Sequence, residues 1–421
     1  MGKNLLIDAL RTNDAALGKK ATGYFEANAS TVSYSTGFPT LDYSLGYKVN
    51  VPDEDGNIIE SYPSVGITAG SYVLLIGKSG TAKTATAISI ASNIVRKFDN
   101  GSVIHFDLEQ ALQYSRIQAL SKFSTQEIKD GKYILRKERC SLEDMKASIM
   151  QIYREKVANP ETYKYKTGKK NEFGEEIEIY EPTVVILDSI ATISVKHEGN
   201  DKKTIEKMEE VSSQTERMQL TAKIGRFFSE LLPYLTEANI TLIAINHIKV
   251  NPQMGIVKTA ADILGLKQDE TLPGGKAPQY YANILLRFET AGKSSAFKVE
   301  EHGFGGFPLT VEVIKSRVSK SLTKTTLVYD SNRGVDMIRS TVEFLKENGR
   351  VGGNKNGYYF LSDEKKEHKF TLVDMISDFR NDRELYMIMK HEAIPLLEPN
   401  LSGIKPEEIG VPDEEANFYD L

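Results

Sequence analysis

The stretch that decides the fold is "YVLLIGKSGTAKTATAIS", residues 72–89. Its apolar opening, glycine-containing turn and alanine- and isoleucine-rich continuation predict a strand, a tight loop and a helix in succession. The turn "GKSGTAKT" fits the phosphate-loop pattern G-x-x-x-x-G-K-[ST] except at Ala82, where the pattern has glycine. The segment therefore predicts a phosphate-binding loop. A chance glycine-rich turn between a strand and a helix is the alternative that the motif alone leaves open.

In such a loop, backbone N–H groups at the start of the helix surround phosphate oxygens, and the helix dipole favours their negative charge. Lys83 would neutralise the β- and γ-phosphates, and the Thr84 hydroxyl would ligate Mg²⁺. Ala82 is compatible with the loop where the backbone at that position already has helical φ and ψ. The predicted nucleotide-binding residues of the loop are Gly77, Ser79, Gly80, Thr81, Ala82, Lys83 and Thr84.

Composition describes an ordinary globular protein of 421 residues, 40% hydrophobic and 26% charged, long enough for two or three folding units. The net charge of −5 argues against a generic polyanion binder but is compatible with a local basic surface. The single cysteine, Cys140, excludes an internal disulfide framework and fits a reducing cytoplasm. No apolar run approaches the roughly 18 residues of a membrane span, so we expect a cytoplasmic protein without a membrane partner.

The fold class follows from seven apolar runs separated by helical or polar stretches. Near-continuous Val, Ile and Leu is typical of strands covered on both faces, which predicts an α/β core with a largely parallel central sheet. The runs are "YVLLIG", "SVIHFDLE", "TVVILDS", "ITLIAINHI", "ANILLRFE", "LTVEVIKSR" and "KTTLVYD".

Changes of pattern divide the chain into four parts. The predicted parts are an N-terminal helical segment (1–30), the core (31–336), a small α+β C-terminal domain (337–394) and an acidic tail (395–421). The first segment would pack either on its own domain or on a neighbouring subunit, and its narrow apolar face does not decide between the two.

Four insertions interrupt the core. Residues 47–63 and 163–182 each place a turn between alternating runs and predict surface β-hairpins. Residues 194–217 and 249–273 are polar or irregular, and long loops of this kind in a compact core are commonly functional or disordered.

Two carboxylates stand at the ends of predicted strands. Asp188 closes "TVVILD", where it would hold a metal ion through water. Because Ser189 follows it in place of an acid, the base for hydrolysis must come from elsewhere. Glu109, in "VIHFDLEQAL", would orient and deprotonate the water that attacks the γ-phosphate, and Asp107 is the alternative, one step deeper. Each acid alone is as readily an ordinary strand-end residue.

A fourth strand, "LIAINHI", ends with Asn246 and His247, and the irregular segment 249–273 follows at once. A polar pair here is commonly only the exit of a strand into solvent. If the strand ends at the same edge as the others, His247 would sense the γ-phosphate and pass its presence to that segment.

Taken in order from about residue 35 to 340, these motifs resemble the RecA family of DNA recombinases, and most of all its phage-encoded, T4-type branch. "STGFPTLDYSLG" is similar to the family's entry segment, "DLEQALQYSR" to the segment of the catalytic base, and "ILDSIATI" to the metal-binding strand. "AINHI" resembles the γ-phosphate sensor, "LPGGKAPQYYA" the element that closes the second DNA-binding loop, and "VIKSRVSK" the basic pair that reaches the adjacent subunit's nucleotide.

The resemblance implies an ATP- and Mg²⁺-dependent protein that forms a homo-oligomeric helical filament on single-stranded DNA. It would pair that strand with a homologous duplex and hydrolyse ATP in a DNA-dependent way. A loading mediator and a single-strand-binding protein are the further partners it implies. The resemblance assigns the role of base to Glu109 and places Lys315 and Arg317 on the γ-phosphate of the neighbouring subunit, and Tyr114 would stack on adenine.

Segments 194–217 and 249–273 would be the two DNA loops, in which lysines contact phosphates without reading sequence. Solvated loop lysines are the alternative reading for each of them. The predicted DNA-binding residues are Lys196, Lys202, Lys203, Lys249, Lys258, Gly274, Gly275 and Lys276. The acidic tail is similar to tails that compete with DNA for the basic surface.

Three other classes of protein are alternatives to the recombinase. A ring-forming replicative helicase has a similar core but needs an N-terminal partner domain, for which about 30 residues leave no room. A recombination mediator would barely hydrolyse ATP, and the presence of Glu109, Lys315 and Arg317 argues against such a degenerate site without excluding it. A kinase would need a lid over a phosphoryl acceptor, and no segment is a good candidate for one.

Overall fold

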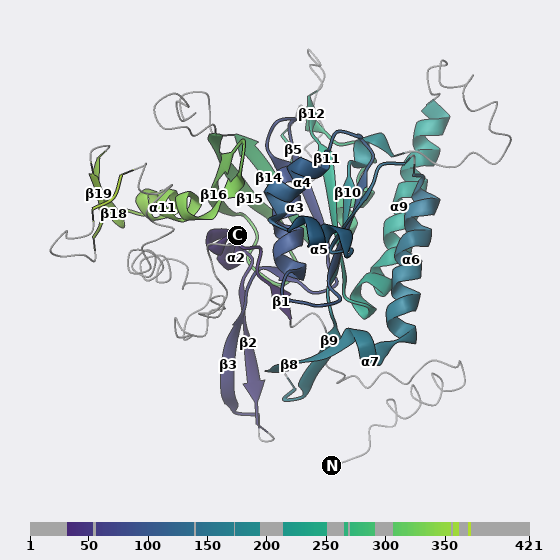
Figure 1. Cartoon of the computed structure of the whole chain (residues 1–421), viewed down its shortest axis with the longest axis horizontal. Helices are drawn as coiled ribbons and strands as arrows, with labels where there is room; N and C mark the ends of the chain where they lie inside the picture. The colour runs from purple at the N-terminus through teal and green to yellow at the C-terminus, as the bar shows by residue number, and fades with distance from the viewer. Residues whose placement is uncertain are drawn as a thin grey trace.

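The computed structural model describes residues 32–53, 56–138, 140–171, 173–193, 214–250, 265–267, 270–290, 306–354, 357–361 and 369–371. Its centre is a nine-stranded sheet with the strand order β17-β16-β15-β14-β5-β11-β10-β6-β7 (Figure 1). These strands are β5 (Tyr72–Gly77), β6 (Ser102–Asp107), β7 (Tyr133–Arg136), β10 (Thr183–Asp188), β11 (Ile240–His247), β14 (Ile284–Thr290), β15 (Gly306–Ser316), β16 (Thr323–Asp330) and β17 (Gly334–Asp336).

Parallel pairing links β14, β5, β11, β10, β6 and β7, and antiparallel pairing adds β15, β16 and β17 at one edge. The prediction of a mixed α/β fold with a largely parallel sheet is confirmed, and all seven predicted strands lie in this sheet. The structure adds two strands that were not predicted, β7 and β17, each at an edge of the sheet.

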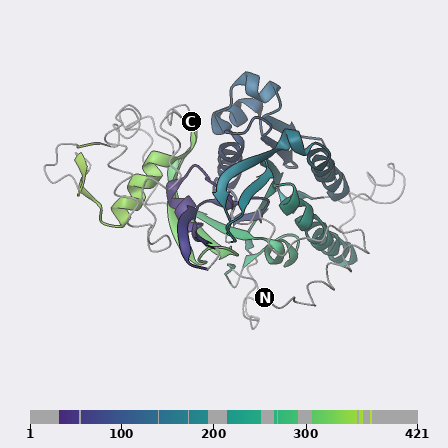
Figure 2. The same ribbon diagram turned by 90° about the horizontal axis from the view of Figure 1, so that it is seen from below.

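Helices cover both faces of the sheet (Figures 1 and 2). The helices are α2 (Pro39–Ser44), α3 (Lys83–Val95), α4 (Tyr114–Ser121), α5 (Thr125–Lys129), α6 (Leu142–Ala158), α7 (Pro160–Tyr163), α9 (Gln214–Glu237), α10 (Ala277–Tyr281) and α11 (Met337–Glu347), with the 3₁₀ turn η2 (Ile190–Thr192). Alternate residues of β5 enter two different cores. Val73 and Leu75 pack with α3, whereas Leu74 and Ile76 pack on the side of α6 and α9.

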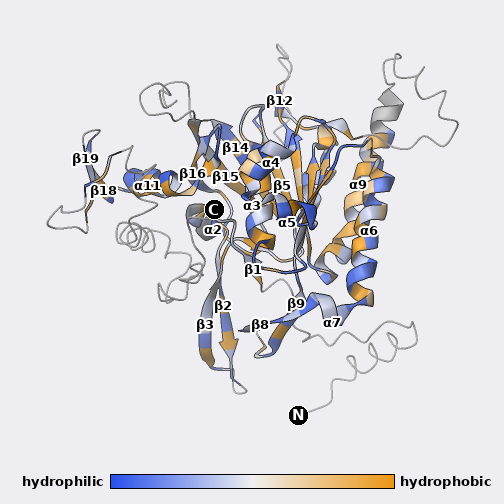
Figure 3. Ribbon diagram, in the orientation of Figure 1, coloured by the Kyte–Doolittle hydropathy of each residue, from blue (hydrophilic) through white to orange (hydrophobic). Residues whose placement is uncertain are grey.

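Every residue of β5 and of β10 is buried, as the continuous apolar runs require. Hydropathy follows the same layering, with apolar residues on the sheet and on the inward sides of α6 and α9 (Figure 3). The sheet is therefore rigid at its centre, and its strand ends are the places where polar side chains can be held in fixed positions.

The remaining strands form two-stranded sheets outside the central one. They are β1 (Ser33–Tyr34) with β4 (Ile67–Thr68), β2 (Tyr47–Pro52) with β3 (Ile58–Ser64), β8 (Lys164–Lys170) with β9 (Glu176–Tyr180), β12 (Lys249–Val250) with β13 (Glu270–Thr271), and β18 (Val351–Asn354) with β19 (Gly357–Phe360).

Both predicted hairpins are present, as β2–β3 and β8–β9, and they project from the core on the side away from β12 (Figure 1). They also contact each other. The Tyr62 hydroxyl donates to the Lys170 carbonyl oxygen at 2.6 Å, and the Lys169 ammonium lies 5.1 Å from the centre of the Tyr62 ring. Two segments more than 100 residues apart in the chain therefore form one projection, which the sequence did not predict.

In the entry segment "STGFPTLDYSLG", the turn ahead of α2 docks on α3, where Asn93 Nδ2 donates to the Thr36 carbonyl oxygen at 2.9 Å. The Asp42 carboxylate accepts hydrogen bonds from the Ser35 hydroxyl and from the backbone N–H and hydroxyl of Thr36, at 2.5–2.6 Å. Gly37 has a φ of +81°, and a Cβ there would lie 1.9 Å from the Asn93 side-chain nitrogen, so any other residue would be strained and would displace that side chain. This motif has a structural reason in the described chain, the docking of one turn onto a helix.

The prediction of a separate C-terminal domain rests on residues that are only partly described. α11 packs on β16 and α2, and the β18–β19 hairpin follows it. Residues 1–30, residues 372–394 and the acidic tail 395–421 lie outside the described residues.

Candidate functional site

Strand register brings the predicted site residues to one edge of the sheet. Gly77 at the end of β5 lies opposite His247 at the end of β11. Asp188 at the end of β10 lies opposite Asp107 at the end of β6. Because these strands run parallel, their carboxyl ends meet, and the sequence-based expectation of a common edge is confirmed.

The loop of residues 77–84 joins β5 to α3, and three of its positions have unusual backbone requirements. A Cβ on Gly77 would lie 2.6 Å from the Phe288 carbonyl oxygen, so this position is closed to other residues. Gly80 has a φ of +78° with open space around it, and Ser79 beside it is exposed. Ala82 has φ 54° and ψ 22°, in the left-handed region.

Ala82 was expected to be compatible with the loop if its backbone had helical φ and ψ. That condition is not met, because the backbone lies in the left-handed and not in the right-handed helical region. The chain turns into α3 at Ala82, which is the N-cap residue, and the turn requires a positive φ. A left-handed conformation costs an L-residue about 1–2 kcal/mol. Ala82 therefore carries backbone strain that glycine would not.

Lys83, the first residue of α3, is buried beneath the loop. Its ammonium donates to the carbonyl oxygens of Gly77 and Lys78 at 3.0 and 2.7 Å and to the Thr81 hydroxyl at 3.3 Å. Burial lowers the pKa of Lys83 to about 8, against the opposing pull of two nearby carboxylates. The cation is thus held inside the curve of the loop, where an anion would meet it.

Thr84 and Asp188 form the pair suited to a metal ion. The Thr84 hydroxyl donates to Asp188 Oδ2 at 2.7 Å. Asp188 is buried, and Oδ1 has no hydrogen-bond partner among the described residues. Burial raises the pKa of Asp188 to about 6 although the bond from Thr84 lowers it. An unsatisfied buried carboxylate oxygen beside a hydroxyl fits Mg²⁺, which prefers oxygen ligands and retains water.

Glu109 faces the same space from the turn after β6. Its Oε1 accepts a hydrogen bond from the Ser189 hydroxyl at 2.7 Å and lies 3.0 Å from His247 Nε2. Ligand atoms of Glu109, Asp188 and His247 all lie within 4.8 Å of one another. Burial, followed by the nearby Lys83 ammonium, lowers the pKa of His247. The side chains predicted from four separate strands are therefore in contact.

The geometry separates Glu109 from Asp107, the alternative base. Asp107 is buried, and its carboxylate accepts the backbone N–H groups of Ala111 and Leu112 at 3.3 and 3.0 Å. Those bonds hold the turn on which Glu109 stands. Asp107 is occupied by a structural task, and Glu109 is the acid that remains accessible.

A polar chain behind Asp188 was missed by sequence reasoning. His105, fully buried on β6, has Nδ1 2.7 Å from the Tyr133 hydroxyl and Nε2 4.0 Å from Asp188 Oδ2. Burial lowers the pKa of His105 to about 3, so the ring is neutral at pH 7. The only signal in the sequence was a histidine inside the apolar run "VIHFD", with nothing to indicate its partners.

Lys315 and Arg317 do not join this cluster. Ser316, between them, pairs with Ile284, which pairs with Val73 at the start of β5. Val73 precedes Gly77 by four residues, and at about 3.3 Å per residue these two ends of β5 are roughly 13 Å apart. The Lys315 ammonium donates to the carbonyl oxygens at the end of α10. Both residues therefore lie level with the amino ends of the parallel strands, whereas the loop of the same chain lies at their carboxyl ends.

The described ends of the segment 249–273 have regular structure. Lys249 opens β12, which pairs with β13, so residues 249–250 and 270–271 form an antiparallel ribbon. The prediction that these residues are irregular was wrong. Polar composition concealed two very short strands. The reading of 194–217 was wrong at its end as well, because α9 begins at Gln214.

The glycine pair that follows the segment 249–273 is tied to the end of β11. Asn246 Nδ2 of β11 donates to the Pro273 carbonyl oxygen at 2.9 Å. Gly274 and Gly275 have φ of +83° and +72°, and a Cβ on Gly275 would lie 2.7 Å from Thr221 Cγ2 of α9. The glycine pair is thus packed beside the end of β11. Exposed Lys276 follows at the start of α10, and Lys196, Lys202, Lys203 and Lys258 lie outside the described residues.

Tyr114, predicted to stack on adenine, is the first residue of α4 and is 57% exposed. An exposed ring at a helix start is available to a ligand, but no contact in the described chain directs it toward the loop.

No protein-family model and no curated protein matches this chain. Among the helices that the structure describes, none is long and apolar enough to cross a membrane.

Proposed function

We propose that this chain is a RecA-like P-loop ATPase that forms a helical filament on single-stranded DNA and catalyses homologous pairing and strand exchange. The observation that carries the proposal is the meeting of Lys83, Thr84, Glu109, Asp188 and His247 at one edge of a parallel sheet. Those residues come from four strand ends, and their chemistry matches the needs of nucleotide hydrolysis one by one.

The residues present fit Mg²⁺ and ATP. Backbone N–H groups of the loop and the Lys83 ammonium would hold the phosphates, and Thr84 and Asp188 would hold the metal ion. Bound in this way, Mg²⁺–ATP supplies the γ-phosphoryl group and the neutralisation of its charge. The unpartnered Asp188 Oδ1 is a buried carboxylate oxygen that such a ligand would satisfy.

In the proposed hydrolysis of ATP, Glu109 accepts the proton of the attacking water. Ser189 and His247 both contact Oε1, which leaves Oε2 without a partner among the described residues. Two contacts on one oxygen fix the plane of the carboxylate and leave the other oxygen to take a proton from water. His247 also adjoins Asn246, whose side chain bonds the segment that ends in Gly274 and Gly275. A change at His247 would reach the proposed DNA-binding element through that bond.

Lys315 and Arg317 lie at the other end of the sheet, so they could act only on a nucleotide bound by another copy. A contact between opposite ends of successive copies is heterologous, and repetition of it builds a helix or a ring. Of these two assemblies we propose the helical filament, in which the lysines of the two loops bind DNA phosphates.

Electron microscopy of the full chain tests this proposal, with single-stranded DNA, Mg²⁺ and a non-hydrolysable ATP analogue. Helical filaments that are absent without nucleotide, together with ATP hydrolysis stimulated by DNA, are the expected result. Closed rings would move the assignment to a ring helicase, and unassembled particles without hydrolysis would move it to a mediator.

A further inference from the structure

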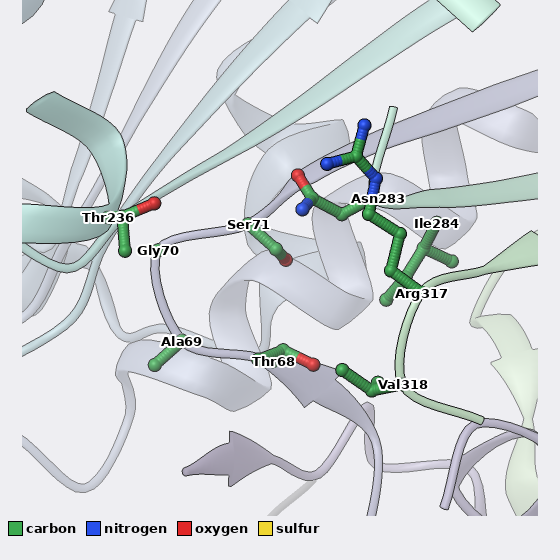
Figure 4. Close-up of a pocket in the computed structure, with 9 residues that line it drawn as sticks. All are labelled: Thr68, Ala69, Gly70, Ser71, Thr236, Asn283, Ile284, Arg317 and Val318. Atoms are coloured by element: carbon green, nitrogen blue, oxygen red, sulfur yellow. The ribbon is translucent and has the colours of Figure 1, made fainter. Parts of the chain in front are cut away.

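Buried polar atoms that have no hydrogen-bond partner among the described residues lie at both ends of the sheet. Thr68 and Ser71 line a small cavity at the amino ends of the parallel strands (Figure 4), but their hydroxyl oxygens are buried beneath its surface, out of reach of anything that enters it. His105 Nε2 and Asp188 Oδ1 are a second such pair, at the carboxyl ends and beside Thr84. This second pair adjoins the proposed metal site, and His105 has no task there so far.

Strand register places Tyr133, His105 and Asp188 on one diagonal across three neighbouring strands. Tyr133 of β7 lies opposite Val103 of β6, and His105, two residues further along β6, lies opposite Ile186 of β10. Asp188 follows two residues further along β10. Because residues two apart on a strand share a face, the three side chains project from the same face of the sheet, each nearer to its carboxyl end than the last.

The contacts along this diagonal differ in length. The Tyr133 hydroxyl lies 2.7 Å from His105 Nδ1, whereas His105 Nε2 lies 4.0 Å from Asp188 Oδ2. Tyr133 and His105 are 1% and 0% exposed. One ring nitrogen of His105 therefore faces a hydroxyl and the other faces a carboxylate.

The surroundings favour a proton on Nε2 of His105. A neutral imidazole carries one proton, on either nitrogen. If Nδ1 carried it, the hydrogen of the Tyr133 hydroxyl would have no acceptor among the described residues, and the lone pair of Nε2 would face the Asp188 carboxylate. With the proton on Nε2, Tyr133 donates to Nδ1 and the N–H group faces Asp188. The second arrangement pairs one more buried donor and replaces a repulsion by an attraction.

The two oxygens of Asp188 have different surroundings. The Thr84 hydroxyl donates to Oδ2, which is also the oxygen that His105 faces, whereas Oδ1 has no partner among the described residues. The gap of 4.0 Å to His105 is longer than a hydrogen bond, and a movement of about 1 Å by the carboxylate would close it. In a buried site an N–H dipole at this distance already attracts the ionised carboxylate.

We propose that His105 is a positioning residue for the metal ion. Held by Tyr133 with its proton on Nε2, His105 keeps Oδ2 of Asp188 turned inward and leaves Oδ1 for a water molecule of Mg²⁺. The inference rests on the proposed function, in which Thr84 and Asp188 hold the ion. Outer partners of this kind fix the orientation of a ligand, and their loss weakens metal binding by about 10–100-fold.

The test replaces both members of the buried pair, His105→Phe together with Tyr133→Phe, in the full chain. Two apolar rings of similar shape leave neither a donor nor an acceptor unpaired, so the fold should be retained, as circular dichroism verifies. The matched control is Tyr72→Phe, because Tyr72 is also a fully buried tyrosine of the sheet and its hydroxyl has no partner among the described residues. Tyr133→Phe alone and His105→Gln, which keeps an N–H donor, are milder variants that carry the test if the double variant does not fold.

Binding of a fluorescent, non-hydrolysable ATP analogue is measured with Mg²⁺ and again with EDTA in its place. The ratio of the two affinities isolates the contribution of the metal ion and does not depend on turnover. We expect the double variant to lower that ratio about tenfold, with the affinity in EDTA unchanged. Tyr72→Phe should keep the full ratio, Tyr133→Phe should lose part of it, and His105→Gln should retain most of it.

A second measurement determines the tautomer without nucleotide. In a chain labelled with ¹⁵N-histidine, NMR distinguishes the two ring nitrogens, and His105→Gln identifies the signals of His105 by their loss. A protonated Nε2 is the expected result, and a protonated Nδ1 would overturn the proposal. Equal losses of affinity with Mg²⁺ and with EDTA would overturn it as well, because they would indicate a general disturbance of the loop.

Failure of the proposed function has a different result from failure of this inference. An unsubstituted chain whose nucleotide binding is unaffected by Mg²⁺ contradicts the proposed function. A chain whose nucleotide binding depends on Mg²⁺, and whose double variant keeps that dependence, contradicts the role of His105 and leaves the proposed function in place.

Discussion

Ala82→Gly is the substitution whose outcome follows most directly from the backbone of the phosphate loop. Ala82 has φ 54° and ψ 22°, and a left-handed conformation costs an L-residue about 1–2 kcal/mol. Glycine removes that cost but gives up about 0.4–1 kcal/mol through the greater freedom of the unfolded chain. We therefore expect Ala82→Gly to stabilise the protein by about 0.5 kcal/mol.

The matched control is the same chemical change a short way along the helix that follows. Ala87 lies in α3 with right-handed backbone and is fully buried. Ala87→Gly should destabilise by about 1 kcal/mol from helix propensity and by about 0.8 kcal/mol from the buried methyl group. The two substitutions should then differ by roughly 2 kcal/mol and in sign, which is well above the error of a denaturant titration.

Equilibrium urea unfolding of the full chain, without nucleotide and followed by circular dichroism, measures both variants against the unsubstituted chain. Equal destabilisation by Ala82→Gly and Ala87→Gly would refute the left-handed assignment, because it would mean that residue 82 is an ordinary first turn of helix. A midpoint that rises for Ala82→Gly and falls for Ala87→Gly supports the strained loop.

The remaining predictions concern catalysis, assembly and pH. Glu109→Gln should lower DNA-stimulated ATP turnover by about 10²–10⁴-fold while a fluorescent nucleotide still binds, and near-normal turnover would assign the base elsewhere. Lys315→Ala and Lys83→Ala chains should each be inactive but should partly recover hydrolysis when mixed. At a hybrid interface one chain supplies an intact Lys83 and the other an intact Lys315. A mixture as inactive as its parts would contradict catalysis between copies. Burial lowers the pKa of Lys156 to about 7, whereas the unfolded lysine keeps a pKa near 10.5, so between these values the unfolded state binds more protons and stability should rise with pH. Between pH 7 and pH 9 the free energy of unfolding in urea should rise by about 1–2 kcal/mol more than it does in Lys156→Met, where Lys83, with its own pKa lowered to about 8, still contributes. An equal rise in both proteins would locate the titration in another group.

The sequence predicted the centre of the sheet because burial on both faces leaves a simple signature. The run "VVIL" at the centre of β10 has no polar position, and β10 is buried at each of its six residues. The edge strand β7 escaped prediction for the opposite reason, since "YILR" alternates burial with exposure over only four residues. Short strands at an edge are specified by the neighbour they pair with, and that neighbour is distant in the chain.

The sequence predicts the residues of the candidate site that lie at the ends of strands. A polar residue after an apolar run marks the carboxyl end of a parallel strand, which is how Asp188, Glu109 and His247 were found. Their mutual contacts depend on register, and so does the division of labour between Asp107 and Glu109. The left-handed backbone of Ala82 was not predictable from residue type, because alanine disfavours it and the surrounding turn imposes it.

The two ends of the sheet bear on why assembly and hydrolysis would be coupled in the proposed filament. The carboxyl ends of the parallel strands carry the loop, the proposed metal-binding pair and the proposed base, and the opposite end of the sheet carries Lys315 and Arg317. The sheet keeps these two ends roughly 13 Å apart along the strands of any one copy. If hydrolysis needs both ends, it needs two copies in contact, and whatever aligns the copies, such as a DNA strand along the axis, would control the rate without touching the reacting atoms.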